Sequence, residues 1–529
     1  MKTLSKVSLT FLLLLLCLSS AFGQIKLGSP FTDHMVLQRG MLVPVWGFAA
    51  PGEKVTVTIN KLNQTTQTGS DGKWNVNFRN LKTGGPYEMI VTGNNSITLT
   101  DVYVGEVWLC SGQSNMDMTV AKEDRYWCGV FNEAQEVATA NYPLIRQFYA
   151  TYSPNLLPQN QVSGEWEVCS PATVGHFRAA AYFFARNLYQ EMNVPIGLLI
   201  TTFGASTAEA WTSRPALEAN PNLTFLLDNF KLKLDKFYSD SARIMATYRD
   251  ETAKFREAAA RARAESANGQ ATQTTAAPRR GPSNPRPWVD QHNPTVLYNG
   301  MVAPLIPYAI RGALWYQGES NGPTAKQYRD IMETMIADWR KAWNQGNFPF
   351  IYVQIANHQD LIKEPVKDDP MVYVREGQLQ NLSIPNTAMV SAIDNADPND
   401  PGNIHPKNKQ EIGLRLAVAA RALAYKEKLT YMGPIYSKMN IEGNTIRVNF
   451  SSAGKGLVAK GDNVTGFAIA GEDKKFVWAN VKIDGTSVIV SSPDVPNPKS
   501  VRYGWGKNPP VNLFNKEGFP TSPFRTDNW

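Results

Sequence analysis

Hydrophobic and polar residues alternate along the first hundred residues of the chain, as they do in half-buried β-strands. Val55, Val57 and Ile59 alternate with polar residues, and Asp71-Gly72 marks a turn before the next alternating run. Short alternating runs separated by turn residues are typical of antiparallel sheets. The alternation returns near the end of the chain, over residues 445–450, 467–470 and 486–490. We therefore expect one β domain over residues 24–102 and a second over residues 429–529.

The middle of the chain, residues 103–428, has a different pattern. Apolar runs that resemble buried strands occupy residues 107–110, 196–203, 312–316, 350–356 and 388–393. Between the third and the fourth, Tyr328 to Trp343 has apolar residues at helical spacing. Strands that alternate with helices predict an α/β domain with a parallel sheet covered on both faces. A polar insertion at about 225–291 interrupts this domain. Its first part favours helices, and its second part, rich in Ala, Thr, Gln and Pro, is predicted to be a disordered loop or linker.

The first 23 residues have the pattern of a secretory signal peptide. Lys2 and Lys6 precede an apolar stretch from Val7 to Leu18, and small residues follow it. This stretch is shorter than the roughly 20 residues that cross a membrane. The sequence therefore predicts an exported protein, periplasmic or extracellular, that begins near Gln24 and has no membrane anchor.

Composition and charge exclude several functional classes. A chain of 529 residues with 43% hydrophobic residues is neither disordered as a whole nor a disulfide-dense miniprotein. Its net charge of +7 falls to +5 without Lys2 and Lys6, and so small a surplus predicts no nucleic-acid partner. Three cysteines outside the signal peptide predict no disulfide framework, although one bridge is allowed. Zinc and P-loop motifs are missing from the sequence, so these two kinds of chemistry lack their usual signals, and the oligomeric state stays open.

Three loops that follow predicted strands contain residues suited to acyl transfer. In open α/β sheets the site lies beyond the carboxyl ends of the strands. Ser114 is a candidate nucleophile, while the backbone N–H of Gly204 and the amide of Asn321 are candidate donors to an oxyanion. Each residue taken alone fits a structural role: a helix cap, a turn glycine or a turn asparagine. Their occurrence after three successive predicted strands favours a site.

A serine nucleophile requires a base, and the five histidines of the chain can be compared by position. Four of them lie in the first β domain, before a helix, beside the insertion or directly after a strand: His34, His176, His292 and His358. His405 lies late in the α/β domain, in a loop that enters a helix near Lys409, where a hydrolase base is commonly found. We therefore expect His405 to be the base, with a surface or capping role as the alternative.

Several segments of the chain resemble the sialate O-acetylesterase family, a branch of the SGNH hydrolases. The similar segments are residues 33–39, 112–116, 203–211, 296–301, 315–321 and 404–409. The resemblance implies a three-layer SGNH fold with a parallel central sheet between the two β domains. It also implies hydrolysis of O-acetyl esters on carbohydrate, most simply on sialic acid, without a metal or cofactor. By this resemblance Ser114 is the nucleophile, His405 the base, and Gly204 and Asn321 the oxyanion-hole residues.

One position departs from the pattern of the superfamily. Many SGNH hydrolases place an orienting aspartate three residues before the histidine, where this chain has Gly402. Asp400 is the nearest acid and is our candidate, while Asp394 and Asp397 lie further back. A backbone carbonyl that orients the imidazole is the other alternative. The sequence therefore leaves a catalytic triad and a Ser-His dyad open.

Other residues near these motifs have two interpretations each. We expect Gln113 and Glu319 either to orient loops or to bind sugar hydroxyls. Trp127, Trp211 and Trp315 are expected to pack in the interior, with stacking on a sugar as the alternative. Two further functions stay open at this point: an acetylesterase for xylan or another plant polysaccharide, and an inactive carbohydrate-binding protein.

Overall fold

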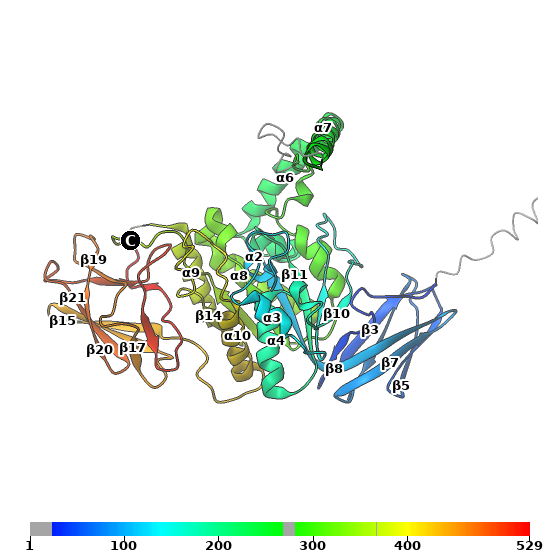
Figure 1. Cartoon of the computed structure of the whole chain (residues 1–529), viewed down its shortest axis with the longest axis horizontal. Coiled ribbons are helices and arrows are strands. Elements are labelled where there is room, and N and C mark those ends of the chain that lie inside the picture. The colour runs from blue at the N-terminus through cyan, green and yellow to red at the C-terminus, as the bar shows by residue number, and fades with distance from the viewer. Residues whose placement is uncertain (1–23, 268–280, 367) are drawn as a thin grey trace, which may run out of the picture.

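The computed structural model describes residues 24–267, 281–366 and 368–529 (Figure 1). The predicted signal peptide, residues 1–23, lies outside the described residues, as do residues 268–280 of the predicted insertion. Within the three described ranges, no helix is both long enough and apolar enough to cross a membrane.

The centre of the molecule is a sheet with the strand order β10-β9-β11-β8-β12-β13-β14. Its strands are β8 Ser96–Gly112, β9 Ile145–Tyr149, β10 Trp166–Val168, β11 Ile196–Thr202, β12 Gly312–Tyr316, β13 Phe350–Gln354 and β14 Thr387–Ser391. The five predicted strands are confirmed. Neighbours are parallel except at one edge, where β10 runs antiparallel to β9, so the sheet is mixed. We did not predict β9, because the buried polar residues Arg146 and Gln147 interrupt its apolar pattern.

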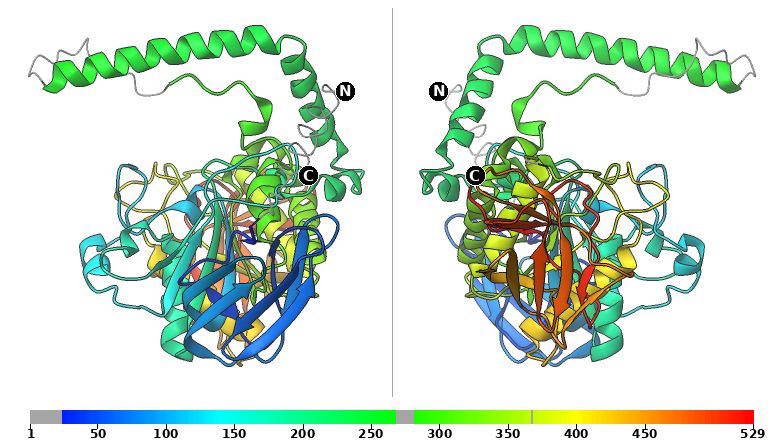
Figure 2. Two further views of the ribbon diagram at one scale, coloured as in Figure 1. Left: turned by 90° about the vertical axis from the view of Figure 1, so that its right-hand side faces the viewer. Right: turned by 90° about the vertical axis from the view of Figure 1, so that its left-hand side faces the viewer.

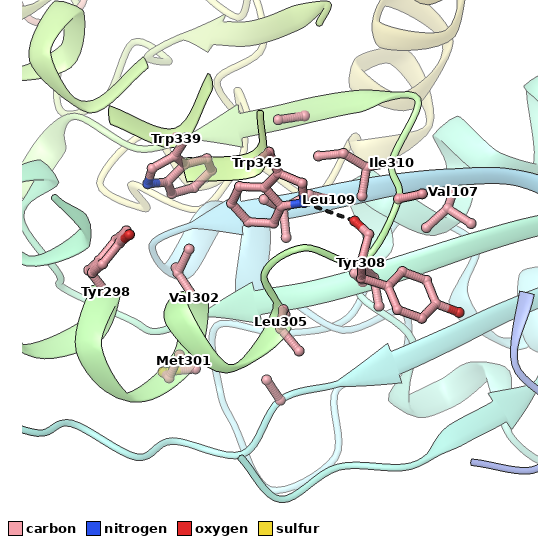
Figure 3. Packing of buried hydrophobic residues seen from close by; sticks show 14 of the residues in the cluster. Val107, Leu109, Tyr298, Met301, Val302, Leu305, Tyr308, Ile310, Trp339 and Trp343 are labelled. Carbon is pink, nitrogen blue, oxygen red and sulfur yellow. Dashed lines mark hydrogen bonds between the residues drawn. The ribbon is translucent and has the colours of Figure 1, made fainter. Parts of the chain in front are cut away.

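Helices cover both faces of this sheet. Alternate side chains of each buried strand point to opposite faces, so both faces are apolar and each packs against helices. The helices are α4 Ala179–Met192, α8 Tyr328–Trp343, α9 Pro370–Gln380 and α10 Lys409–Ala424. Leu109 of β8 packs in one hydrophobic cluster with Trp339 of α8, as Figure 3 shows. Trp108, its neighbour in the sequence, packs in the cluster formed with α4 and α10 on the other face. The central α/β region therefore has three layers, with a sheet between two layers of helices.

The two helices α4 and α10 approach each other closely. A Cβ atom added at Gly413 of α10 would lie 2.4 Å from the Cβ atom of Phe183 in α4. Only glycine fits at this crossing. The close packing fixes the start of α10, and therefore the loop that precedes it, relative to the sheet.

The first β region is continuous with the central sheet through β8. Its strands are β1 Lys26–Leu27, β2 Val36–Gln38, β3 Val43–Phe48, β4 Lys54–Ile59, β5 Leu62–Gln67, β6 Lys73–Phe78 and β7 Gly84–Thr92. The first half of β8 pairs with β2 and β7, and its second half pairs with β11 and β12. A single strand therefore crosses the expected domain boundary between residues 102 and 103.

The C-terminal β region consists of small antiparallel sheets (Figure 2). Its strands are β15 Ile435–Glu442, β16 Thr445–Ser451, β17 Leu457–Ala459, β18 Phe467–Ala470, β19 Val477–Trp478, β20 Asn480–Asp484, β21 Ser487–Ser491, β22 Ser500–Tyr503, β23 Leu513–Asn515 and β24 Phe524–Arg525. The three alternating runs near the end of the chain correspond to β16, β18 and β21, so the strands predicted there are confirmed.

The insertion begins with two helices, α6 Thr224–Tyr238 and α7 Ser241–Ala267. Figure 2 shows α7 extending away from the rest of the molecule. The prediction of helices in this part of the insertion is confirmed. The shorter helices are α2 Ser114–Asp117, α3 Glu133–Ala138, α5 Arg214–Glu218, the 3-10 helices η1 Val174–His176, η2 Ala208–Trp211, η4 Pro287–Val289, η6 Ala303–Leu305, η7 Glu319–Gln327 and η8 Asn381–Ser383, and the π-helix η5 Tyr298–Val302.

The buried carboxylate of Glu106 on β8 joins the first β region to the central sheet. It accepts hydrogen bonds from Gln38 Nε2 at 3.1 Å, from Arg39 Nε at 2.6 Å and from Arg311 Nε at 2.8 Å. Removing one partner from such a group leaves the others with unpaired charge or hydrogen bonds.

We expect Glu106→Ala to lower the free energy of unfolding by roughly 2 to 4 kcal/mol, less than for a fully buried pair because both arginines reach solvent. Urea denaturation measures this change. The matched control is Glu442→Ala, which removes an exposed ion pair with Arg447 and should leave the free energy of unfolding close to the wild-type value. Equal effects of the two substitutions would contradict this role of Glu106.

Candidate active site

The three loops identified in the sequence meet at the carboxyl ends of the central strands. Strand β8 lies between β11 and β12, and all three run in parallel. Gly112 at the end of β8 pairs with Thr202 of β11 and with Tyr316 of β12. Because the three strands end at the same level, the loops that follow them are neighbours.

A sharp turn after β8 places Ser114 at this end of the strands. Gly112 has a φ of 141°, and a Cβ atom there would lie 2.2 Å from the carbonyl oxygen of Tyr316. Only glycine satisfies both conditions. The backbone N–H of Gln113 then donates to the same carbonyl at 3.1 Å, and Ser114 begins the short helix α2. The serine is therefore held at a fixed position, with 9% of its surface exposed.

The hydroxyl of Ser114 is paired with His405. Nε2 of His405 lies 2.8 Å from Oγ of Ser114, although 291 residues separate the two in the sequence. Burial and, to a smaller extent, the charge of Lys409 lower the pKa of His405 to about 4. The imidazole is therefore neutral at pH 7, which is the form that accepts a proton from a hydroxyl group.

The structure does not bring Asp400 to this pair. Its side chain is exposed and makes no hydrogen bond or ion pair with any described residue. Asp394 forms an ion pair with Arg415 at 2.7 Å, and Asp397 accepts a hydrogen bond from the backbone N–H of Asn399 at 2.9 Å. Among the residues that the structure describes, no carboxylate or carbonyl accepts a hydrogen bond from Nδ1 of His405.

Gly204 and Asn321 occupy different positions relative to Ser114. A Cβ atom at Gly204 would lie 3.7 Å from that of Ser114, so the Gly204 backbone is next to the serine. Nδ2 of Asn321 donates to Glu209 at 2.8 Å and to Thr324 at 3.0 Å, which uses both of its hydrogen atoms. Asn321 therefore connects the β11 and β12 loops in this structure and has no N–H left for a ligand.

Gln113 and Glu319 both hold loops together here. Oε1 of Gln113 accepts hydrogen bonds from the backbone N–H groups of Gly318 at 3.2 Å and Ser320 at 3.3 Å. Oε1 of Glu319 accepts from Nδ2 of Asn115 at 2.7 Å, while its Oε2 is buried without a partner among the described residues. Burial raises the pKa of Glu319, and the hydrogen bond from Asn115 opposes this shift. These contacts agree with the interpretation that Gln113 and Glu319 orient loops, rather than with binding of sugar hydroxyls.

Two residues that we did not single out, Asn115 and Lys409, connect the serine loop to the histidine loop. Nδ2 of Asn115 also donates to the carbonyl of Ile404 at 3.0 Å, and its Oδ1 accepts from Nζ of Lys409 at 2.8 Å. Nζ of Lys409 donates in addition to the carbonyl of Pro406 at 2.7 Å. The residues on both sides of His405 are therefore anchored to this pair. In the sequence, Asn115 directly follows Ser114 and Lys409 is four residues after His405, and these positions were the only indication of their role.

Lys409 is fully enclosed, which is unusual for a lysine. Burial lowers its pKa to about 7, while the nearby carboxylate of Glu319 raises it. The ammonium group therefore loses its proton close to neutral pH. This change alters the charge beside His405.

Among the three tryptophans, Trp127 alone lies at the site. Its ring centre is 4.9 Å from that of His405, and its side chain is half-buried. Arg125 lies over the same ring at 4.9 Å, and an ion pair with Asp117 at 2.9 Å holds this arginine. Trp211 and Trp315 are completely buried, so they pack in the interior and cannot stack on a ligand.

The described residues contain no group of three or more His, Cys, Asp or Glu side chains able to hold a metal ion. Cys110, Cys128 and Cys169 are buried as free thiols, so the one disulfide that the sequence allowed is not formed among them. Burial raises the pKa of Cys110 above its ordinary range.

This chain is similar to several carbohydrate acetylesterases. Residues 280–422 match the family described as carbohydrate esterase, sialic acid-specific acetylesterase. The sialate O-acetylesterase of Homo sapiens is 30% identical over 478 residues, which cover 83% of this chain and 78% of that protein. The enzyme of the same name from Rattus norvegicus is 29% identical, with 94% of this chain and 93% of the relative covered. A solved carbohydrate acetylesterase from Xanthomonas citri is 33% identical with a TM-score of 0.77, and the match covers 96% of this chain and 100% of that one.

The lowered pKa of His405 can be measured directly. We expect its ring to titrate at about pH 4 in a nitrogen-15 NMR titration assigned with His405→Asn. Since the ring of an unfolded chain titrates near 6.5, the unfolded state binds the extra proton first. This histidine therefore contributes to stability above pH 6.5 and loses that contribution as the pH falls to about 4.

The influence of Lys409 on this titration has a matched control. Lys409→Met should raise the pKa of His405 while leaving it below the ordinary value, because burial is the larger cause of the shift. Lys407→Met, in the same loop, should leave the titration unchanged. A wild-type midpoint at or above 6.5, or equal effects of the two substitutions, would contradict the proposed environment of His405.

Proposed function

Because the chain belongs to the sialate O-acetylesterase family, we propose that it removes O-acetyl groups from sialic acid through an acyl-enzyme formed on Ser114. That the chain is a carbohydrate esterase follows from its relatives; the proposal concerns its mechanism and its sugar. The observation that carries the mechanism is the 2.8 Å hydrogen bond between His405 Nε2 and Ser114 Oγ. This pair has the geometry of a nucleophile and its general base.

In the first half of the proposed reaction, His405 takes the hydroxyl proton of Ser114 as Oγ attacks the acetyl carbonyl carbon. The carbonyl oxygen becomes an oxyanion and accepts hydrogen bonds from the backbone N–H groups of Ser114 and Gly204. The intermediate then collapses, the bond to the sugar oxygen breaks, and the protonated His405 gives its proton to that oxygen. The deacetylated sugar leaves, and the acetyl group remains on Ser114.

In the second half, His405 takes a proton from water, and the hydroxide attacks the acetyl-serine. Collapse of this intermediate releases acetate and returns the proton to Ser114. The low pKa of His405 supports its role as a base, since the neutral ring is available over a wide pH range. Lys409 opposes the positive charge that develops on this ring, and loss of the Lys409 proton near pH 7 reduces that opposition.

The proposed oxyanion hole relies on two backbone N–H groups. For Asn321 to contribute as well, one of its hydrogen bonds to Glu209 or Thr324 has to open when substrate binds. In place of a triad with Asp400, the acid predicted from the sequence, we propose a Ser-His dyad. The Trp127 ring beside His405 and the anchored backbone at Ile404 and Pro406 support a fixed imidazole without a carboxylate.

We extend the proposal to the fold and to the location of the enzyme. The three layers around a largely parallel sheet support an SGNH hydrolase fold for residues 103–428, with β domains at residues 24–102 and 429–529. The charged and apolar pattern of residues 1–23 supports export to the periplasm or the cell exterior.

Substitution of the nucleophile tests the mechanism. Ser114→Ala should reduce acetate release from O-acetylated sialic acid by a factor on the order of 1,000 or more, because no covalent intermediate can form. Ser96→Ala, which changes an exposed serine at the start of β8, should retain the wild-type rate. A Ser114 variant with nearly wild-type activity would refute the mechanism.

A comparison of substrates tests the choice of sugar. For the wild-type enzyme we expect kcat/KM on acetylated xylo-oligosaccharides to be lower than on O-acetylated sialic acid by more than about tenfold, which is 1.4 kcal/mol of transition-state binding.

Substitution of Asp400 distinguishes the dyad from the triad. Since its carboxylate is exposed and has no contact with His405, we expect Asp400→Asn to change kcat by less than about threefold. Loss of the orienting aspartate in a well-studied serine protease costs about four orders of magnitude. A fall of a hundredfold or more would show that Asp400 reaches the imidazole during the reaction.

A further inference from the structure

A cleft lies at the amino-terminal ends of the central strands, opposite the end where Ser114 lies. It has a volume of about 670 Å³. One wall is formed by strands β3 and β6, and the other by residues 303–307 and 342–345. These two segments precede β12 and β13, whereas the candidate active site lies beyond the carboxyl ends of the strands. The cleft is therefore near the amino-terminal ends of the strands, whereas Ser114 and His405 are at the carboxyl ends.

The pairing of β3 with β6 determines which side chains face this cleft. Trp46 pairs with Asn75, Pro44 with Asn77, and Phe48 with Lys73. Paired residues lie on the same face of a sheet, and all six line the cleft. The intervening residues, such as Val45 and Val76, are buried on the opposite face. The register thus places the Trp46 ring directly beside the Asn75 amide.

Four of the five amide side chains that line this cleft make no hydrogen bond within the described residues. Asn75, Asn77, Asn160 and Asn344 line the cleft, and their side chains make no hydrogen bond with any residue in the described ranges. Gln345, which also lines it, differs because its amide is used by the backbone of Ile310 at 3.0 Å. An amide side chain has two N–H donors and an oxygen acceptor. Four such groups are therefore free to bind a ligand.

Two other aromatic rings hold the ring of Trp46 in place. It packs against Phe31, with ring centres 4.6 Å apart, and against Tyr308, with ring centres 6.3 Å apart. The rest of the side chain is partly exposed, and its indole N–H has no partner among the described residues. A partly exposed ring that is packed against two others offers a flat apolar surface next to a hydrogen-bond donor.

We propose that this cleft binds a neutral oligosaccharide, as a carbohydrate-binding site separate from the esterase site. The apolar C–H face of a sugar ring packs on an aromatic ring, while its hydroxyl groups pair with amides. The volume lies within the range of about 300 to 1,000 Å³ that is usual for ligand pockets. Lys73 is the one charged residue that lines the cleft among those described, which favours a neutral sugar over an anionic one. The site would hold the enzyme on a glycan whose other residues carry acetyl groups.

Titration calorimetry with unacetylated sugars tests the proposal on the full chain. The probes are xylohexaose, cellohexaose and lacto-N-tetraose, which are neutral and carry no ester. We expect at least one to bind with a Kd between micromolar and millimolar, and the double variant Asn75→Ala/Asn77→Ala to weaken that binding at least tenfold. The matched control is Asn63→Ala, an exposed asparagine on the neighbouring strand β5, which should bind as the wild type does.

Hydrolysis of p-nitrophenyl acetate separates this site from the catalytic one. The double variant should hydrolyse it within twofold of the wild-type rate, and Ser114→Ala should still bind the oligosaccharide. A wild-type protein that binds none of the three sugars at millimolar concentration would overturn the proposal. So would a double variant that binds as tightly as the wild type, or binding that is lost in Ser114→Ala. Failure of the acyl-enzyme mechanism would leave these binding results unaffected.

Discussion

The side chain of Asn115 connects the parts of the site that come from distant positions in the chain. It lies next to Ser114 and makes hydrogen bonds with Glu319, Lys409 and the carbonyl of Ile404. A buried asparagine has to satisfy its polar atoms within the protein, and here it does so by joining the β8 loop, the β12 loop and the histidine loop. The distance between Ser114 and His405 depends on this connection.

The network explains how a charged lysine is tolerated in the interior. An isolated buried ammonium group is strongly unfavourable, but Nζ of Lys409 donates to Asn115 and to the carbonyl of Pro406, and Glu319 lies near enough to affect its pKa. The remaining cost appears as the lowered pKa of Lys409 and the raised pKa of Glu319. Groups that hold the catalytic loops in place also determine the charge around His405.

The sequence predicted most of the fold around the site because its strands are continuous apolar runs. Ser114 and His405 were predicted from their positions after strands and before a helix, and the structure places them in contact. Strand β9 was missed because Arg146 and Gln147 are buried there, and their contacts come from distant segments. The roles of Asn115 and Lys409 depend on packing between loops, which no local pattern records.

The same limit applies to the two residues whose expected contacts are not seen. The sequence distance between Asp400 and His405 does not show that the Asp400 side chain points to solvent. The residue type of Asn321 does not show that both of its N–H groups are used within the protein. In both cases the chemistry of the residue was compatible with the role, and the direction of the side chain decides the contact.

The most direct test of the proposed mechanism is identification of the acylated residue. The enzyme is mixed rapidly with p-nitrophenyl acetate, quenched in acid during the first turnovers, digested and analysed by mass spectrometry. The mechanism predicts an acetyl group on Ser114 that forms within the first turnover and disappears as the substrate is consumed. An acetyl group on another residue that forms at the catalytic rate, or turnover with Ser114 unmodified at every time point, would contradict it.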